Sequence, residues 1–237
     1  MLAIEGAMGV VLLAACTALV VRTVHRGSSA PTGPHIATLA ADGHSAATLQ
    51  VITGTPALTI SMANLGLTGT LLRVSTPAAS SAPQLRTAGG AGNPVVYLST
   101  KDATAITVTL NEAVSWQLNL AAGTTRTVAD LRGGQVTGIA VTKGSDVIDL
   151  TLSKPDGSVP IRLAAGSSRV QLSRPSGVPA RVAAAAGAGE ISLDGKNHVG
   201  VPAGSVFTTP TWTPGVAGYD LDATAGTAHI TVTTQAS

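Results

Sequence analysis

A glycine-centred repeat is the feature of this sequence that most constrains its fold. Around Gly166, apolar residues stand five and three positions before the glycine and four and six positions after it. Because these apolar positions alternate with polar ones, each arm has the pattern of a strand with one buried face. Each repeat therefore predicts a strand, a bend at glycine and a second strand. The same offsets recur around four other glycines, namely Gly54, Gly144, Gly187 and Gly226.

The spacing of the repeats indicates how the units assemble. Gly123 matches the first half of the pattern, and the steps from 123 to 144, 166 and 187 are 21 or 22 residues long. Segments rich in Pro and Gly, Ser153–Gly157 and Ser173–Gly177, join successive units as turns. Two short strands cannot bury a face alone, but stacked units share a core. The sequence thus predicts an all-β fold, a β-solenoid-like stack of Gly-punctuated strand pairs with a repeat of about 21 residues.

The first 22 residues have a different character. From Leu2 to Val21 the only charge is Glu5, and the uncharged run 6–21 would form a helix of roughly 24 Å. With residues 2–5 added, the helix can span a hydrocarbon core of about 30 Å, so we predict an uncleaved transmembrane anchor helix over residues 1–22. Two alternatives stay open: a lipoprotein cleavage site before Cys16, and a cleaved signal or buried helix.

The rest of the chain divides by composition. Residues 23–45 form a Ser/Gly/Pro-rich linker, residues 46–110 a first β block with a Pro/Ala/Gly-rich loop at 76–94, and residues 111–235 the repetitive β-solenoid. Arg22 and Arg26 follow the apolar segment and favour a cytoplasmic location for what comes after them. The composition of the chain beyond Arg26, which is rich in Ser, Thr, Gly and Ala, is typical of exported domains. We therefore expect a single-pass protein of the cell membrane whose C-terminal domain lies outside the cytoplasm.

Charge and cysteine usage exclude several kinds of partner. The formal net charge is +2, and it falls to +1 when Glu5, Arg22 and Arg26 are left out. No basic patch for nucleic acid is apparent. The only cysteine is Cys16, which excludes a disulfide framework and a cysteine-based metal site.

Catalytic motifs are absent from the sequence. No nucleophile elbow, S-x-x-K, phosphate-binding loop or H-E-x-x-H occurs. His198 and His229 are the candidates for acid/base or metal chemistry, together with Asp194, Asp220 or Asp222, but we interpret them as a loop residue and a strand residue. No dense calcium loop is formed by Asp146, Asp149 and Asp156. We therefore expect no enzyme activity, no cofactor and no metal.

Aromatic residues make up only 2% of the chain, which draws attention to the segment around Trp212. Trp212 stands between two prolines with Tyr219 nearby, and an exposed pair of rings would suit binding of a glycan or a protein. The alternative is that these rings, with Trp116, cover an open end of the stack.

The Gly-punctuated strand pairs of Leu118–Val232 resemble the toastrack-type, adhesin-like β-solenoid domains of bacterial envelope proteins, and Leu49–Leu110 does so more loosely. The resemblance implies an extracytoplasmic scaffold without catalytic residues, in some cases linked to cell-wall stress signalling. We expect a membrane-anchored, non-catalytic interaction or scaffold module for an envelope protein or glycan partner; the alternatives are a sensor subunit of an envelope stress system and a polysaccharide-acting enzyme. The positions expected to face outward are Gln50, Thr59, Asn119, Arg162, Gln171, Ser192, Asp222 and Thr231.

Overall fold

The protein is built from two β-sheets laid face to face. A computed structural model describes residues 33–66, 69–89 and 92–235, and within them the prediction of an all-β fold is confirmed. The ten-stranded sheet contains, in spatial order, β1 (His35–Ala40), β4 (Thr70–Thr76), β7 (Ala105–Asn111), β3 (Thr55–Ala63), β9 (Thr124–Leu131), β11 (Ser145–Leu152), β13 (Ser167–Arg174), β19 (Thr227–Thr234), β15 (Ala188–Leu193) and β16 (Lys196–Val201). The nine-stranded sheet contains β17 (Ser205–Thr208), β14 (Ala180–Ala184), β18 (Gly218–Ala223), β12 (Ser158–Leu163), β10 (Gln135–Val141), β8 (Ser115–Leu120), β2 (Ala46–Val51), β6 (Val95–Ser99) and β5 (Gln84–Ala88).

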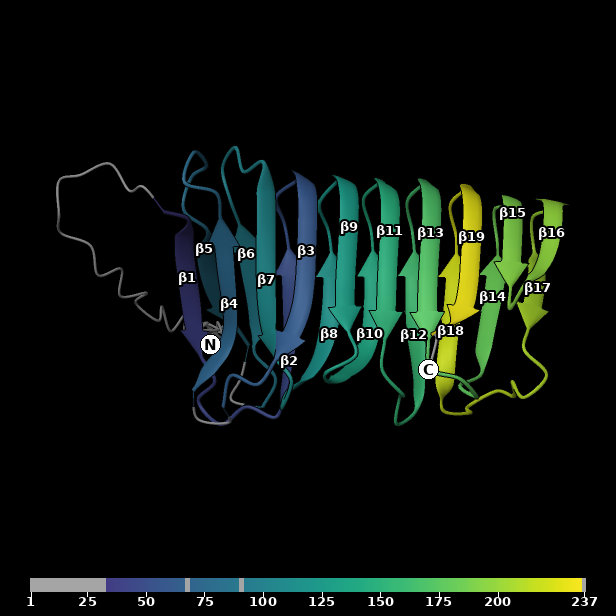
Figure 1. The fold of residues 1–237 in the computed structure, drawn as a ribbon, viewed down its shortest axis with the longest axis horizontal. Helices are drawn as coiled ribbons and strands as arrows, with labels where there is room; N and C mark the ends of the chain where they lie inside the picture. Colours follow the sequence, from purple (N-terminus) through teal and green to yellow (C-terminus); the bar gives the residue numbers. More distant parts are fainter. Residues whose placement is uncertain (1–32, 67–68, 90–91, 236–237) are drawn as a thin grey trace, which may run out of the picture.

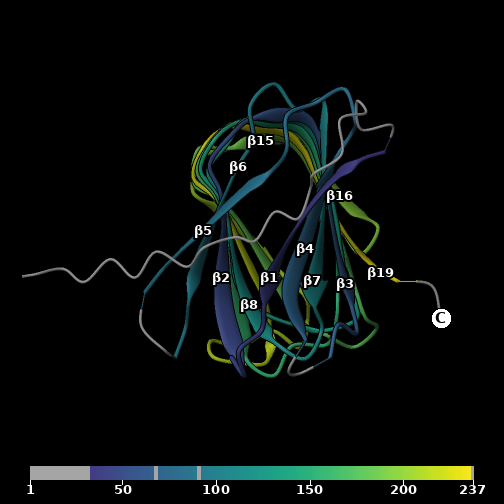
Figure 2. The ribbon, with the colours of Figure 1, turned by 90° about the vertical axis from the view of Figure 1, so that its left-hand side faces the viewer.

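Pairs of consecutive strands link the two sheets. In each pair, a strand of the nine-stranded sheet passes through a bend into a strand of the ten-stranded sheet, and neighbouring pairs run parallel (Figures 1 and 2). Every apolar position of the five glycine-centred repeats is buried between the sheets. The core consists of aliphatic rows such as Ile148, Val170 and Ile230, which face one another across adjacent strands. Alternation of apolar and polar residues is thus what fixes the inner and outer faces.

The spatial order of the pairs differs from their order in the sequence. The last pair, β18–β19, lies between β12–β13 and β14–β15, with parallel pairing on both sides in both sheets. Near the other end, β2–β3 lies between β6–β7 and β8–β9. The repeats around Gly166 and Gly187, which are neighbours in the sequence, are therefore separated by the layer that contains Gly226.

Antiparallel strands close the two ends of the stack. At one end β4 and β1 follow β7 in the ten-stranded sheet, and β5 follows β6 in the other. At the other end β16 pairs with β15, and β17 pairs with β14. We call the end formed by β16 and β17 the cap end. Figure 1 shows the strands side by side along the long axis, with β1 and the cap end at opposite extremes.

Two segments that were predicted to lack regular structure contain strands. β1 lies inside the predicted linker 23–45, and β5 lies inside the predicted loop 76–94. Both are edge strands whose short sequences lack the glycine-centred pattern, and partner strands supply their hydrogen bonds. The predicted helix over residues 1–22, with Cys16, lies outside the described residues. Among the residues that are described, no helix is long and apolar enough to cross a membrane.

Candidate interaction surface

The candidate acid/base residues lie apart from one another. His229 is on the outer side of β19, where its Nδ1 lies 3.4 Å from Glu190 Oε2. His198 belongs to β16 rather than to a loop, because a tight turn through Asp194 and Gly195, both with positive φ, joins β15 to β16. Within the described part of the chain, no group of three or more His, Cys, Asp or Glu side chains is arranged to hold a metal ion.

Three of the six candidate aspartates, Asp149, Asp194 and Asp220, form ion pairs with arginines. Arg181 bonds Asp220 at 2.5 Å, Arg174 bonds Asp194 at 2.5 Å, and Arg126 pairs with Asp149 across neighbouring strands. These carboxylates therefore neutralise arginines.

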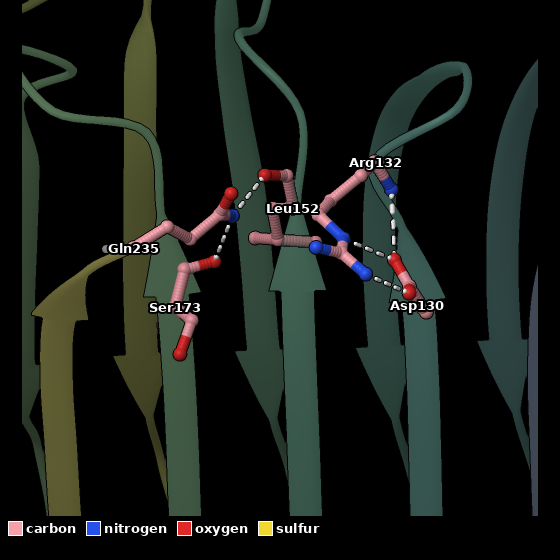
Figure 3. A network of polar contacts seen from close by, with 5 residues as sticks. All are labelled: Asp130, Arg132, Leu152, Ser173 and Gln235. Atoms are coloured by element: carbon pink, nitrogen blue, oxygen red, sulfur yellow. Dashed lines mark hydrogen bonds and ion pairs between the residues drawn. The ribbon is translucent and has the colours of Figure 1, made fainter. Parts of the chain in front are cut away.

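A further polar network lies at the end of the strands of the ten-stranded sheet. There Arg132 donates side-chain hydrogen bonds to Asp130 and holds the pKa of that carboxyl below its ordinary value. Figure 3 shows this pair beside Gln235, whose amide donates to the carbonyl oxygens of Leu152 (2.7 Å) and Ser173 (3.2 Å). Gln235 thus ties the end of β19 to β11 and β13.

Two hollows on the described surface are open to solvent. One, of about 430 Å³, is bordered by small residues at the β14–β15 bend, including Ala186, Gly187 and Thr227. The other, of about 390 Å³, lies beside Met62 and the Asp130–Arg132 pair. Neither hollow gathers several polar groups around an enclosed space, which is how small-ligand sites are built.

Tyr219 is not available for the predicted contact with a partner. Its side chain is 2% exposed, and its hydroxyl donates to the carbonyl oxygen of Ser153 at 2.5 Å. The reason is alternation: Tyr219 stands two residues before Leu221, so it faces the core like Leu221 and Ala223. This pattern is visible in the sequence, but the scarcity of aromatic residues drew attention to exposure instead.

The other two rings fall in different environments. Trp116 stands two residues before Leu118, is fully buried in the middle of the stack, and donates its Nε1–H to the carbonyl oxygen of Asn111. It therefore covers no open end. Trp212 is half-buried in the connection 209–217 between β17 and β18, where its backbone N–H donates to the carbonyl oxygen of Thr209.

A stacked ring pair closes the cap end instead. His198 lies opposite the buried Ile191, and Phe207 lies opposite the buried Val182, so both rings are on the core side of the last layer. Their centroids are 4.2 Å apart with an interplanar angle of 29°. The sequence does not predict this pair, because Phe207 lies outside the repeats and the residues around His198 resemble a loop.

The glycines of the repeats form a column along the bends. A Cβ on Gly54 would lie 2.9 Å from the carbonyl oxygen of Gly123, and a Cβ on Gly166 would lie 3.4 Å from that of Gly226. The backbone at Gly166 is not left-handed, and a Cβ there would reach the limit of ordinary van der Waals contact, whereas a Cβ at Gly54 would be too close to the next layer. Gly187 differs, since its φ is +82° and a Cβ there would lie 2.9 Å from the carbonyl oxygen of Val201.

The outer face of the ten-stranded sheet carries rows of short polar side chains. We call the best-formed of these the Thr59 row; its members lie opposite one another on adjacent strands, about 4.8 Å apart. Two ion pairs, Arg126–Asp149 and Arg132–Asp130, balance charge on the same face, where His229 Nδ1 also lies 3.4 Å from Glu190 Oε2. In spatial order the Thr59 row contains Ser75, Thr107, Thr59, Val128, Asp149, Gln171, Thr231, Ser192 and Asn197.

The nine-stranded sheet presents a less uniform outer face. Alanines interrupt its central row, and aromatic and charged side chains stand beside them. The four positions of this sheet that were expected to face outward lie in one row, which contains Arg86, Tyr97, Gln50, Asn119, Ala140, Arg162, Asp222, Ala183 and Val206.

Comparison with known proteins identifies the fold. A solved structure of a putative cell adhesion protein from Clostridium sporogenes ATCC 15579 superimposes with a TM-score of 0.68 at 15% sequence identity. The match covers 85% of this chain and 99% of that chain. No protein-family profile and no curated protein matches the sequence. At this level of identity, the likeness shows that the two proteins share a fold.

Proposed function

We propose that this chain is a non-catalytic interaction module that acts outside the cytoplasm. In this proposal residues 1–22 hold it at the cell membrane, and the two-sheet stack is a β-solenoid of the toastrack type that presents a binding face to an envelope protein or a glycan. The shared fold with a protein described as a putative cell adhesion protein supports this assignment.

The Thr59 row is the observation that carries the proposal. Eight of nine adjacent strands contribute a hydroxyl, amide or carboxylate group to this row, and the ninth contributes Val128. Continuous backbone pairing holds these side chains at regular spacing. Such a face is preorganised, so a partner binds it without the cost of ordering loops. Because Arg126 and Arg132 on this face are paired with aspartates, hydrogen bonds over a wide area, rather than a charged pocket, would supply the recognition. Trp212 is a second proposed contact, since it is half-exposed in a connecting segment.

Photo-crosslinking in intact cells tests the face. A benzophenone side chain is placed at Gln171, in the centre of the Thr59 row, and at Asn119 on the outer face of the other sheet as the matched control. We expect a discrete adduct from Gln171 and none from Asn119. Adducts from neither position, or from Asn119 alone, would contradict the assignment to this face.

Two further measurements address the rest of the proposal. Loss of the Gln171 adduct in Trp212→Ala would support Trp212 as a contact, whereas an unchanged adduct would remove it. The non-catalytic assignment would fail if the purified chain hydrolysed a cell-wall polymer and His198→Ala or His229→Ala abolished that hydrolysis.

A further inference from the structure

We infer that the cap end is a self-association surface, which takes the cap end of a second copy of this chain. In the resulting dimer, β16 pairs antiparallel with its symmetry mate, and β17 does the same in the other sheet. This inference rests on the geometry of the cap end and does not depend on the function proposed above.

Both sheets end in an open edge at the cap end. In the described part of the chain, β16 pairs only with β15 and β17 pairs only with β14, so each leaves a row of backbone N–H and C=O groups without a strand partner. Five of the six residues of β16 are exposed. Unpaired edges of this kind are templates for a further strand. The usual protection by charge is limited to Lys196, at the turn end of β16.

Apolar groups gather on the same end. Val199 on β16 is 81% exposed, and Val206 on β17 is 50% exposed. They lie beside the His198–Phe207 stack, in which His198 is exposed and Phe207 is half-buried. Covering these side chains removes apolar surface from water, which favours association by about 25 cal/mol per Å² of apolar area.

One two-fold axis satisfies both edges. Val199 lies opposite Glu190, three residues after the Gly187 bend, and Val206 lies opposite Ala183, four residues before it. The two valines therefore lie at similar distances from the bend, and an axis perpendicular to both sheets passes near both of them. Rotation about such an axis reverses the strand direction, which gives antiparallel pairing in each sheet and an interface made from the same patch twice.

The charges on β16 and β17 are compatible with this two-fold arrangement. Lys196 is the only Lys, Arg, Asp or Glu residue in β16 and β17. If the axis passes at Val199, the two Lys196 Cα atoms lie about 20 Å apart, since each is three residues from the axis. That separation exceeds the screening length of about 8 Å at physiological salt. The first described strand, β1, lies at the opposite end of the stack from this surface.

Disulfide trapping gives the first test. In the full chain with Cys16→Ser, Val199→Cys places two thiols opposite each other near the axis, at a Cα separation that a disulfide can bridge. We expect a covalent dimer on mild oxidation. The matched control is Ile36→Cys, which is also exposed and lies on β1 at the other end. Equal trapping of both variants, or trapping of neither, would overturn the inference.

Sedimentation of the full chain in a nonionic detergent gives the second test. Val199→Lys puts two like charges near the axis and should weaken dimerisation at least about tenfold, whereas Ile36→Lys should leave it unchanged. Because Val199 is exposed, the variant should fold, and its circular dichroism spectrum checks this. A wild-type chain that stays monomeric at submillimolar concentration, or a Val199→Lys chain that dimerises as well as the wild type, would contradict the proposal.

Discussion

At the scale of single residues, Gly187 is the glycine of the column whose replacement should cost most. Its backbone is left-handed, and an added Cβ would approach the carbonyl oxygen of Val201. Gly187→Ala should therefore lower the free energy of unfolding by about 1–3 kcal/mol. Gly226→Ala is the control, since a Cβ there meets nothing within 4 Å and φ is not left-handed. Denaturant titration of both variants measures the difference, and equal midpoints would show that the constraint at Gly187 is absent.

Tyr219 should make stability depend on alkaline pH. Burial raises the pKa of its phenol well above the ordinary value, although the hydrogen bond to Ser153 opposes this shift. In the unfolded chain the phenol ionises near pH 10, whereas the folded protein keeps its proton, so stability falls as pH rises above about 10.

Tyr219→Phe separates this effect from packing. The variant should lose about 1 kcal/mol at neutral pH, because it lacks the hydrogen bond to Ser153. Above about pH 10 its stability should decline less than that of the wild type. Parallel declines in the two proteins would mean that Tyr219 does not titrate on unfolding. Chemical denaturation across the alkaline range provides the measurement.

Residue patterns predicted the core well and the surface less well. The aliphatic residues at fixed distances from the repeat glycines are all buried. In a strand with one buried face, alternating apolar side chains can reach the core in only one register. The same alternation, extended two residues back from Leu221 and from Leu118, places Tyr219 and Trp116 in the core. The scarcity of aromatic residues instead suggested that Tyr219 contacts a partner or that both rings cover an open end of the stack. Nothing in the local sequence of Phe207 indicates a cap, since its role depends on β17 being the last strand of its sheet.

At the scale of elements, the buried Arg174 connects the two strands that flank β19. Arg174 ends β13, lies in register with Thr234 of β19, and reaches Asp194, which directly follows β15. Its side chain is 2% exposed, and its Nε has no hydrogen-bond partner among the described residues. The Arg174–Asp194 ion pair therefore bridges β19 and connects β13 with β15, the two strands beside it.

Asp194→Asn should weaken this connection. Removing the carboxylate charge leaves a buried guanidinium without a counter-charge, at a cost of about 2–4 kcal/mol after allowance for the partial exposure of Asp194. Asparagine tolerates the left-handed backbone at this position, so strain is not added. The matched control is Asp130→Asn, which breaks an exposed pair and should leave the thermal midpoint almost unchanged. A small effect at both sites would show that Arg174 finds other partners.

The order of the elements could not be predicted from the sequence. The segment 153–157 joins adjacent layers, whereas the similar segment 175–179 passes over a layer that β18–β19 later fills. Both segments have five residues rich in Pro and Gly, and five extended residues reach about 17 Å, which exceeds the roughly 10 Å needed to pass one layer. Local spacing thus permits both routes, and only the pairing of all the strands decides between them.

At the scale of the whole molecule, location is the property that a direct experiment decides. If residues 1–22 span the membrane and the stack lies outside the cytoplasm, a protease added to intact spheroplasts should digest the chain from residue 33 onward. Protection until lysis would mean that Arg22 and Arg26 keep the stack in the cytoplasm. A cytoplasmic reporter protein that stays intact in the same sample is the control. The mass of the chain, compared with that of Cys16→Ser, shows whether a lipid is attached.

The interior position of the last strand pair links the fold to protein synthesis. A chain that ends before Gly218 lacks a layer from the middle of the stack, and β12, β13, β14 and β15 each then lose a parallel neighbour. The ribosome makes this layer after all the other described layers, so neither sheet can become continuous before residues 218–234 have been made. A chain truncated before this layer exposes four strand edges in the interior of the stack, and edges of that kind invite aggregation and proteolysis. Completion of both sheets therefore depends on synthesis of β18 and β19.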